Sequence, residues 1–348
     1  MDERFKGKGG PRIGAARPAA VRLSPAALVA AAPLAEAGAP PLAVRPLAEG
    51  LNLAQWAARH RPQVESWLLE HGAILFRGFG VSSASEFESF ARAVSDELLE
   101  YQERAAPRSQ VSGHVYTSTE FPADQRISLH HEMSYSHNWP RKVLFYCEQP
   151  AAQGGSTPLS DDREVFRLLD PKIKERFMSR KVMYVRNYGT GVDLSWEDAF
   201  QTTDRAVVEE YCRKSRTAFE WREGNRLRTR YVRQAVATHP VTGETVWFNH
   251  AHMFHVSSLP PEVQRSLLEV FTEDELPRNV FYGDGAPIER SCLEEIRETY
   301  RRAALSFPWE KGDVLLVDNF LASHGREPYV GPRKVLVALA DLYTNEQV

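Results

Sequence analysis

The segment LHHEMSY at 129–135 places a histidine and a carboxylate two positions apart, as His130 and Glu132. Alternate side chains of a β-strand share a face, so these two would project together, with His131 on the opposite side. A distant second histidine, His324, would complete a set of two imidazoles and one carboxylate. Such a set leaves coordination positions open for substrates and suits Fe(II) oxygenases. By itself the triplet is weak evidence, because the chain contains 11 histidines and 46 acidic residues.

The residues around His324 strengthen this interpretation. An apolar run, GDVLLVD at 312–318, ends in a polar turn that contains His324, and Arg333 opens the next apolar run. A planar guanidinium can hold a carboxylate through two parallel, charge-assisted hydrogen bonds. The order of histidine and arginine therefore predicts a dicarboxylate site beside the metal, although an arginine at a strand end can equally be a solvated surface charge.

A second histidine cluster offers an alternative metal site. In VWFNHAHMFH at 246–255, His250 and His252 would share a strand face, and His255 lies close behind. An all-histidine site could hold zinc, copper or iron. Neither a carboxylate nor an anion-binding arginine accompanies this cluster at matching spacing, so we interpret these residues as pocket lining or core.

These candidate residues lie mainly on predicted strands, whereas the predicted helices cluster between them. The patterns predict strands over 73–79, 143–147, 182–188, 245–249, 314–318 and 334–342, and helices over 62–71, 85–100, 204–216, 261–271 and 289–304. Ser83 and Glu86 have the spacing of a helix capping box. Strands and helices do not alternate regularly, which favours an antiparallel barrel or sandwich decorated with helices over a doubly wound sheet.

Composition limits the classes of partner. The net charge of −3 argues against nucleic acid or anionic membrane as an obligatory partner. No apolar run is long enough to span a bilayer, and three widely spaced cysteines (Cys147, Cys212 and Cys292) suit a reducing cytoplasm. We expect residues 1–42, rich in alanine and proline, to be a disordered or extended segment, and 43–348 to form one domain.

Several segments, taken in order, resemble the taurine dioxygenase (TauD/TfdA) family of Fe(II)/2-oxoglutarate-dependent oxygenases. They are GAILFRGF at 72–79, VYTSTEFP at 115–122, LHHEMSY at 129–135, WPRKVLFYC at 139–147, GGSTPLSD at 154–161, HPVTGETVWFN at 239–249 and GDVLLVDNFLASHGREPYVGPR at 312–333. The resemblance is greatest to the branch that acts in nonribosomal-peptide and amino-acid pathways, such as the syringomycin-type aspartyl hydroxylases.

The resemblance implies a mainly β fold with helical insertions around a double-stranded β-helix (jelly-roll) core of the clavaminate synthase-like type. It implies Fe(II) bound by His130, Glu132 and His324, with O2 as co-substrate. It also implies that Arg333 and the hydroxyl of Thr157 bind the C5 carboxylate of 2-oxoglutarate.

Two departures from the family pattern bear on the reaction. The metal-binding carboxylate is Glu132 rather than the commoner aspartate, and Val337 stands where a taurine enzyme would have a sulfonate-binding arginine. Taurine is therefore disfavoured as substrate. Halogenation is disfavoured too, because related halogenases leave the carboxylate position empty for chloride. Hydroxylation is the expected reaction; epoxidation, desaturation or ring closure would use the same cofactors. A non-catalytic, metal-binding jelly-roll is the remote alternative.

The substrate is expected to be a small amino-acid-like or peptide-like molecule, either free or presented by a carrier protein, in natural-product biosynthesis. The candidate contacts are charged, aromatic or amide side chains near the motifs: Arg104, Arg108, Arg126, Arg326, Tyr135, Trp247, Phe248 and Asn249. Each of these arginines has an alternative interpretation as a surface charge, and each aromatic residue as core packing. The oligomeric state is not predicted.

Overall fold

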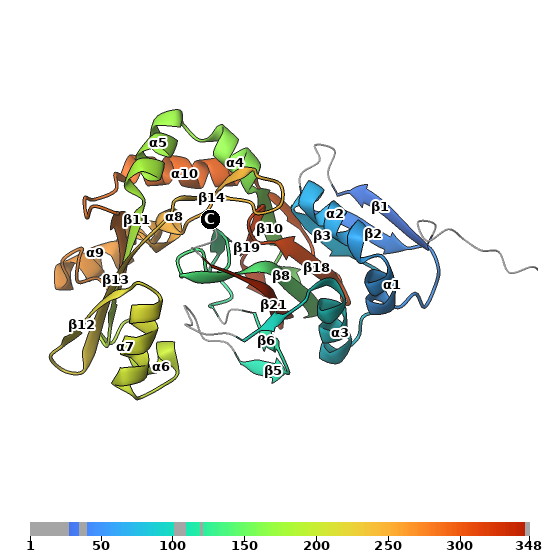
Figure 1. Ribbon diagram of the computed structural model, residues 1–348, viewed down its shortest axis with the longest axis horizontal. Coiled ribbons are helices and arrows are strands. Elements are labelled where there is room, and N and C mark those ends of the chain that lie inside the picture. Colours follow the sequence, from blue (N-terminus) through green and yellow to red (C-terminus); the bar gives the residue numbers. More distant parts are fainter. Residues whose placement is uncertain (1–27, 35–39, 101–108, 119–120, 345–348) are drawn as a thin grey trace, which may run out of the picture.

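The computed structural model describes residues 28–34, 40–100, 109–118 and 121–344, and its centre is a pair of β-sheets (Figure 1). The larger sheet has the strand order β1-β2-β3-β18-β8-β21-β6-β5, with β4 beside β21, and only the pairing of β2 with β3 is parallel among its described strands. Its strands are β1 Val29–Pro33, β2 Leu42–Pro46, β3 Ala73–Phe76, β4 Leu98–Leu99, β5 Gln110–Ser112, β6 Val115–Thr117, β8 Asn138–Gln149, β18 Val314–Asp318 and β21 Lys334–Thr344.

The side chains of the larger sheet alternate between two cores, because successive residues of a strand point to opposite faces. On β8, Leu144 and Tyr146 pack in the cluster that contains the N-terminal helices. Val143, Phe145 and Cys147 pack in a second cluster, shared with residues of the smaller sheet. This continuous apolar run therefore marks a strand that is buried on both faces, and the strand predicted over 143–147 is confirmed as part of β8.

The smaller sheet has the order β17-β10-β19-β7 and is antiparallel throughout its described strands. Its strands are β7 Ile127–His130, β10 Thr157–Asp161, β17 Leu305–Phe307 and β19 Ala322–Arg326. Strand β19 is central, so His324 lies opposite Leu159 on one side and His130 on the other. The sheet thereby brings together segments nearly 200 residues apart in the sequence.

Three helices cover the outer face of the larger sheet: α1 Leu53–Arg59, α2 Arg61–His71 and α3 Ala84–Val94 (Figure 1). The helix predicted over 85–100 is too long at its C-terminal end, because α3 ends at Val94 and the chain then forms β4. The hydroxyl of Ser83 accepts a bond from the Glu86 backbone N–H, at 3.2 Å. The Glu86 carboxylate instead binds the backbone N–H and the hydroxyl of Ser82.

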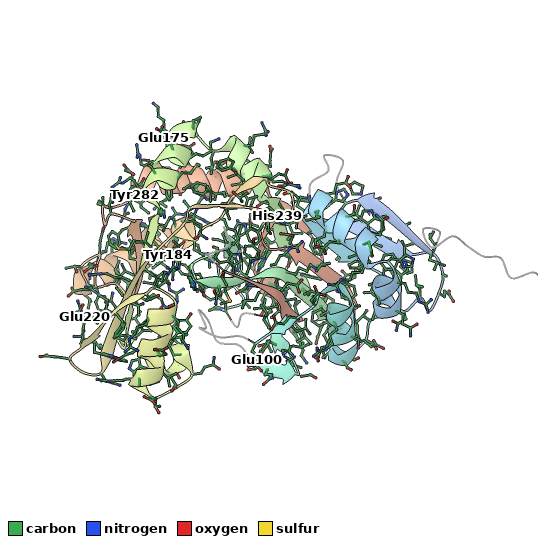
Figure 2. All side chains as sticks on the ribbon, in the orientation of Figure 1. Glu100, Glu175, Tyr184, Glu220, His239 and Tyr282 are labelled. Atoms are coloured by element: carbon green, nitrogen blue, oxygen red, sulfur yellow. The ribbon has the colours of Figure 1, made fainter. Side chains whose placement is uncertain are left out.

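An insertion between the sandwich strands forms a separate layer with the sheet order β12-β13-β11-β16. Two short strands outside this insertion, β9 Gln153–Gly154 and β20 Tyr329–Val330, pair with each other. The elements of the insertion, with those that connect it to the sandwich, are α4 Asp162–Leu168, α5 Pro171–Arg180, β11 Val182–Tyr188, α6 Trp196–Phe200, α7 Arg205–Lys214, β12 Ala218–Arg222, β13 Arg226–Arg233, β14 Val236–Thr238, β15 Thr245–Trp247, α8 Ala251–Phe254, η2 Val256–Ser258, α9 Pro261–Val270, β16 Arg278–Tyr282 and α10 Arg290–Ala303. Tyr184 of β11 is fully buried in its core (Figure 2).

One predicted strand is partly wrong. Strand β15 ends at Trp247, and α8 begins at Ala251, so His250 and His252 do not share a strand face. The side-chain oxygen of Asn249 accepts a bond from the Ala251 backbone N–H, at 3.0 Å, which closes the turn into the helix. The predicted β-sandwich with helical insertions is confirmed.

The predicted segment 1–42 contains part of the larger sheet. Within it, Val29–Pro33 forms β1, which pairs along its length with β2, and Val29 is buried. The predicted domain boundary at residue 43 stays a prediction. The three cysteines are free thiols, and no helix in the described part of the chain is long and apolar enough to cross a bilayer.

Candidate metal centre

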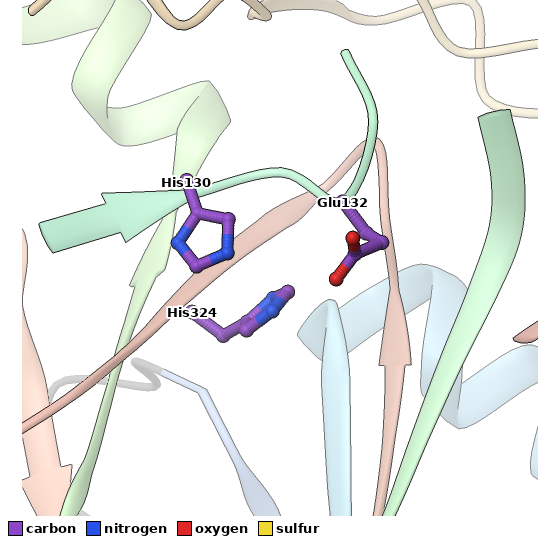
Figure 3. A group of neighbouring side chains, drawn as sticks. All are labelled: His130, Glu132 and His324. Carbon is purple, nitrogen blue, oxygen red and sulfur yellow. The ribbon is translucent and has the colours of Figure 1, made fainter. Parts of the chain in front are cut away.

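Three side chains predicted as metal ligands converge at one end of the smaller sheet (Figure 3). Candidate ligand atoms of His130, Glu132 and His324 all lie within 4.8 Å of one another, and the two imidazole centroids are 4.6 Å apart. Glu132 and His324 are buried. Strand β7 ends at His130, so Glu132 reaches the site from the turn that follows rather than from the predicted strand.

The donor set fits an iron(II) ion. Two imidazole nitrogens and one carboxylate on one side of a site give a facial arrangement with open positions. The Nδ1 atom of His130 lies 2.8 Å from the carbonyl oxygen of Ser128. A carbonyl can only accept, so Nδ1–H donates and Nε2 is the coordinating atom of this ring.

Asn319 fixes the backbone at Glu132. Its side-chain oxygen accepts a bond from the Glu132 N–H at 2.7 Å, and its amide nitrogen donates to the carbonyl oxygens of Glu132 and Pro140 at 2.9 Å each. Asn319 is completely buried. Asn319 was not among the residues predicted from the sequence, where its only signal is a polar side chain that follows an apolar strand, five positions before His324.

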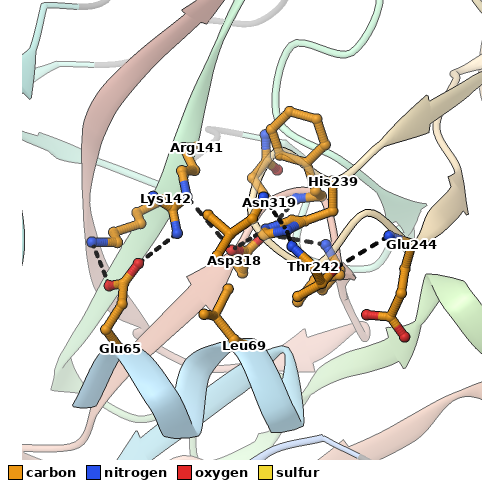
Figure 4. Close-up of polar contacts among 12 residues, drawn as sticks. Glu65, Leu69, Arg141, Lys142, His239, Thr242, Glu244, Asp318 and Asn319 are labelled. Atoms are coloured by element: carbon orange, nitrogen blue, oxygen red, sulfur yellow. Dashed lines mark hydrogen bonds and ion pairs between the residues drawn. The ribbon is translucent and has the colours of Figure 1, made fainter. Parts of the chain in front are cut away.

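The turn that carries Asn319 is held by a second buried group, Asp318 (Figure 4). One carboxylate oxygen accepts the Leu321 backbone N–H at 3.2 Å. The other lies 3.1 Å from Nε2 of His239. Nδ1 of His239 accepts the Thr242 backbone N–H at 3.0 Å, so Nε2 carries the proton and donates to Asp318. These bonds link the turn before β19 to the β14–β15 hairpin.

A pocket extends from the three candidate ligands toward Arg333. It is lined by Ser118, Ile127, His130, Glu132, Phe145, Thr157, His324, Gly325, Arg326, Arg333 and Val335. The structure thus places both predicted 2-oxoglutarate contacts, Thr157 and Arg333, in the same pocket as the three candidate ligands.

The guanidinium of Arg333 fits an anionic ligand. Its Nε donates to the Gly155 carbonyl oxygen at 3.2 Å, and no carboxylate of the described residues forms an ion pair with it. Burial, with a contribution from the nearby charge of Arg326, lowers the pKa of Arg333 to about 10. Arg333 is half-buried, and a partly desolvated positive charge without a carboxylate is costly, so a bound dicarboxylate would compensate it.

Two consecutive glycines precede β10, and the second of them makes room for Arg333. Gly154 and Gly155 have φ of +68° and +70°, a region that side chains other than glycine rarely adopt. A Cβ on Gly155 would lie 3.1 Å from the Arg333 Cδ and Nε atoms. A Cβ on Gly154 would instead clash with the Pro328 carbonyl oxygen. Gly155 of the GGSTPLSD motif therefore allows the Arg333 side chain to pass close to the backbone, and Gly154 allows the close approach of Pro328.

Arg326, predicted as a substrate contact, lines the pocket but binds protein groups. Its guanidinium donates to the carbonyl oxygens of Phe121, Pro122 and Gln125, at 3.0, 2.5 and 2.8 Å. It therefore fastens the segment 121–125 beside the pocket.

Other predicted substrate residues do not line this pocket. Arg126 pairs with Glu327 at 2.8 Å and lines a neighbouring cavity. Tyr135 is buried against Phe254, and the amide nitrogen of Asn249 donates to the Ala235 carbonyl oxygen. Trp247 and Phe248 are core residues, whereas Arg104 and Arg108 lie outside the described residues.

The alternative histidine cluster does not form a metal-binding group in the described structure. Nδ1 of His250 is 2.7 Å from the Ser134 hydroxyl, and Nε2 of His252 is 2.9 Å from the Leu129 carbonyl oxygen. Burial lowers the pKa of His252 to about 3 and that of His255 to about 4. These imidazoles are neutral and bond to neighbouring protein groups.

Comparison with known proteins places this site in a family. The family model described as "Taurine catabolism dioxygenase TauD, TfdA family" matches residues 39–339. The dapdiamide synthesis protein DdaC of Enterobacter agglomerans is 42% identical over 282 residues, covering 81% of this chain and 85% of its own. A clavaminate synthase-like protein of Arabidopsis thaliana is 33% identical, covering 79% and 83%.

Solved structures share the fold at low sequence identity. The PvcB protein of Pseudomonas aeruginosa superposes with a TM-score of 0.53 at 18% identity, over 91% of both chains. The AAD-2 protein, solved in complex with Mn(II) and N-oxalylglycine, has a TM-score of 0.53 at 16% identity, covering 90% of this chain and 96% of its own. The jelly-roll core expected from the sequence is thereby confirmed.

Proposed function

The chain belongs to the TauD/TfdA family of dioxygenases, and we propose that it hydroxylates an unactivated C–H bond of an amino acid or small peptide-like metabolite. It is a non-haem iron enzyme that depends on 2-oxoglutarate and O2. The observation that carries the proposal is one pocket that holds the two-histidine, one-carboxylate group and, beyond it, the half-buried guanidinium of Arg333, which has no carboxylate partner among the described residues.

Each side chain of the pocket has a distinct task in this proposal. His130, Glu132 and His324 hold the iron, and Arg333 with Thr157 holds the far carboxylate of 2-oxoglutarate. When bound, iron with O2 and 2-oxoglutarate supplies the oxidising power. Asn319 keeps Glu132 in position, and the apolar side chains of Ile127, Phe145 and Val335 limit the access of water.

The substrate class rests on sequence relatives. A protein of dapdiamide synthesis is 42% identical over most of both chains, and Val337 occupies the position expected for a sulfonate-binding arginine. Of the predicted substrate arginines, Arg126 and Arg326 are engaged with protein groups. These two arginines therefore give no reason to prefer a substrate with a free carboxylate. The proposal includes both free amino acids and amino acids presented by a carrier protein, in a cytoplasmic natural-product pathway.

The test is turnover with a substrate panel. The purified chain is incubated with Fe(II), 2-oxoglutarate and O2, and with amino acids offered both free and as thioesters on a carrier protein. Succinate release that depends on one substrate, with a product heavier by about 16 mass units, is expected for hydroxylation.

Product mass and structure also separate the other reactions of the same cofactors. A loss of about 2 mass units would indicate desaturation or ring closure, and epoxidation would require structure determination of the oxygenated product. If no free or carrier-bound amino acid stimulated succinate release, the proposed substrate class would be wrong. His130→Ala is the control for iron-dependent turnover.

A further inference from the structure

The hydroxyl of Thr157 has a buried neighbour that does not line the pocket, the indole of Trp309. Thr157 begins β10 and pairs with Phe307 of β17. Trp309 follows Phe307 by two residues, so its side chain can reach the Thr157 side chain. The indole Nε1 lies 2.9 Å from the Thr157 Oγ1. Thr157 is 5% exposed and Trp309 is 8% exposed, so solvent does not compete freely for this bond.

The chemistry of the two groups fixes the direction of this bond. An indole N–H only donates, whereas a hydroxyl has one proton to donate and two lone pairs that accept. Thr157 Oγ1 must therefore accept from Trp309, and its proton remains available for another acceptor. Because Thr157 lines the pocket that contains Arg333, that acceptor can be an anionic oxygen in the pocket.

The indole is itself held in place. The backbone carbonyl of Pro308 accepts a bond from Arg77 Nη2 at 2.7 Å, and Arg77 forms a buried ion pair with Asp313. The rings of Phe307 and Trp309 pack with centroids 5.1 Å apart. The position of the Nε1–H group is thus determined by the fold before any ligand binds.

We propose that Trp309 is a positioning residue, whose indole N–H orients the Thr157 hydroxyl as a donor to the distal carboxylate of 2-oxoglutarate. This inference rests on the proposed roles of Thr157 and Arg333. Trp309 acts only through Thr157, so its removal weakens binding of the co-substrate and does not alter the metal ligands.

The test is the dissociation constant of 2-oxoglutarate in anaerobic titrations of the Fe(II) enzyme, followed by the weak visible charge-transfer band. Trp309→Phe keeps an aromatic ring and removes the N–H, and it should weaken binding about tenfold, the effect of roughly one hydrogen bond to a charged group. In turnover, KM for 2-oxoglutarate should rise with little change in kcat. Thr157→Val should weaken binding at least as much, and the double variant should bind like Thr157→Val alone.

Two controls separate this role from packing. The analogue 2-oxovalerate lacks the distal carboxylate, so its affinity, measured by competition, should be equal in the wild type and Trp309→Phe. If Trp309→Phe does not fold, β-(3-benzothienyl)alanine at position 309 keeps the shape of the side chain and replaces the N–H by sulfur. It should give the same loss of affinity.

The outcomes distinguish this proposal from the function on which it rests. If wild type does not bind 2-oxoglutarate, or if Arg333→Gln binds it as well as wild type does, the proposed binding roles fail. If Arg333→Gln loses affinity while both position-309 variants bind like wild type, only the role of Trp309 is overturned. An equal loss from Trp309→Phe in the wild-type and Thr157→Val backgrounds would also overturn it.

Discussion

Replacing Asn319 by alanine should weaken both the fold and the metal site. The Asn319 amide makes three buried hydrogen bonds, to the Glu132 N–H, the Glu132 carbonyl oxygen and the Pro140 carbonyl oxygen. At about 1 kcal/mol for each bond, Asn319→Ala should lower the free energy of unfolding by about 3 kcal/mol. The backbone that carries the Glu132 carboxylate loses its fixed position, so affinity for the metal should fall by roughly tenfold to hundredfold.

The chain contains a matched control, Asn187 in β11. Its amide nitrogen donates to the Asp274 and Leu276 carbonyl oxygens, and its oxygen accepts from Arg228 Nε, so it also makes three bonds, two of them buried and one partly buried. Asn187→Ala should therefore cost a similar free energy of unfolding. Because Asn187 lies in the insertion sheet, metal affinity should remain that of the wild type.

Two measurements decide the outcome. Urea unfolding of the metal-free proteins gives the change in stability, and anaerobic titration with Fe(II) or Mn(II) gives the dissociation constant. Equal metal affinities for Asn319→Ala and Asn187→Ala would refute the reasoning that Asn319 positions Glu132. A stability loss below about 1 kcal/mol for Asn319→Ala would show that its bonds are replaced after mutation.

Three further predictions follow from the same geometry. His130→Ala should abolish Fe(II) binding in the anaerobic titration, whereas His250→Ala should largely preserve it; the reverse result would assign the metal to the alternative histidine cluster. Arg326→Gln should release the segment 121–125, raise KM for 2-oxoglutarate roughly tenfold and speed proteolysis there; unchanged proteolysis would contradict this anchoring role. His252 and His255 remain neutral when folded, because burial lowers the pKa of these groups to about 3 and about 4. The unfolded chain takes up these protons below its ordinary pKa of about 6.5, so stability should be full at pH 7 and fall toward pH 4 by up to about 1.4 kcal/mol per pH unit for each group. Urea unfolding at several pH values should show that the free energy of unfolding depends less steeply on pH in His255→Gln than in the wild type. An unchanged pH dependence would argue that His255 is not held in a buried neutral state.

The order of the motifs made much of the chemistry readable without a structure. His130, Glu132, His324 and Arg333 were predicted from their residue types and from the apolar strands beside them, because a metal ligand or a carboxylate anchor must have a particular functional group. The structure brings these four side chains to one pocket. Apolar runs also predicted β8 and β18, since a strand buried on both faces needs apolar side chains at consecutive positions.

The sequence was a poorer guide where one local pattern fits two structures. The segment 246–255 has alternation that suits a strand, yet the chain turns into α8 after Asn249 binds the Ala251 N–H. Four arginines near the motifs were predicted as substrate contacts: Arg104, Arg108, Arg126 and Arg326. Only the fold shows that Arg126 meets Glu327 and that Arg326 meets backbone carbonyl groups from a segment 200 residues earlier.

The sequence by itself determined which functional groups are available: two imidazoles, a carboxylate, a guanidinium and the strands that carry them. Tertiary structure decided which of these groups meet and what holds them, as in the contacts of Asn319 with Glu132 and of Trp309 with Thr157. These contacts join residues 187 and 152 positions apart. No local sequence pattern predicts these contacts, because their geometry depends on how the two sheets pack and on the register of β19 between β10 and β7.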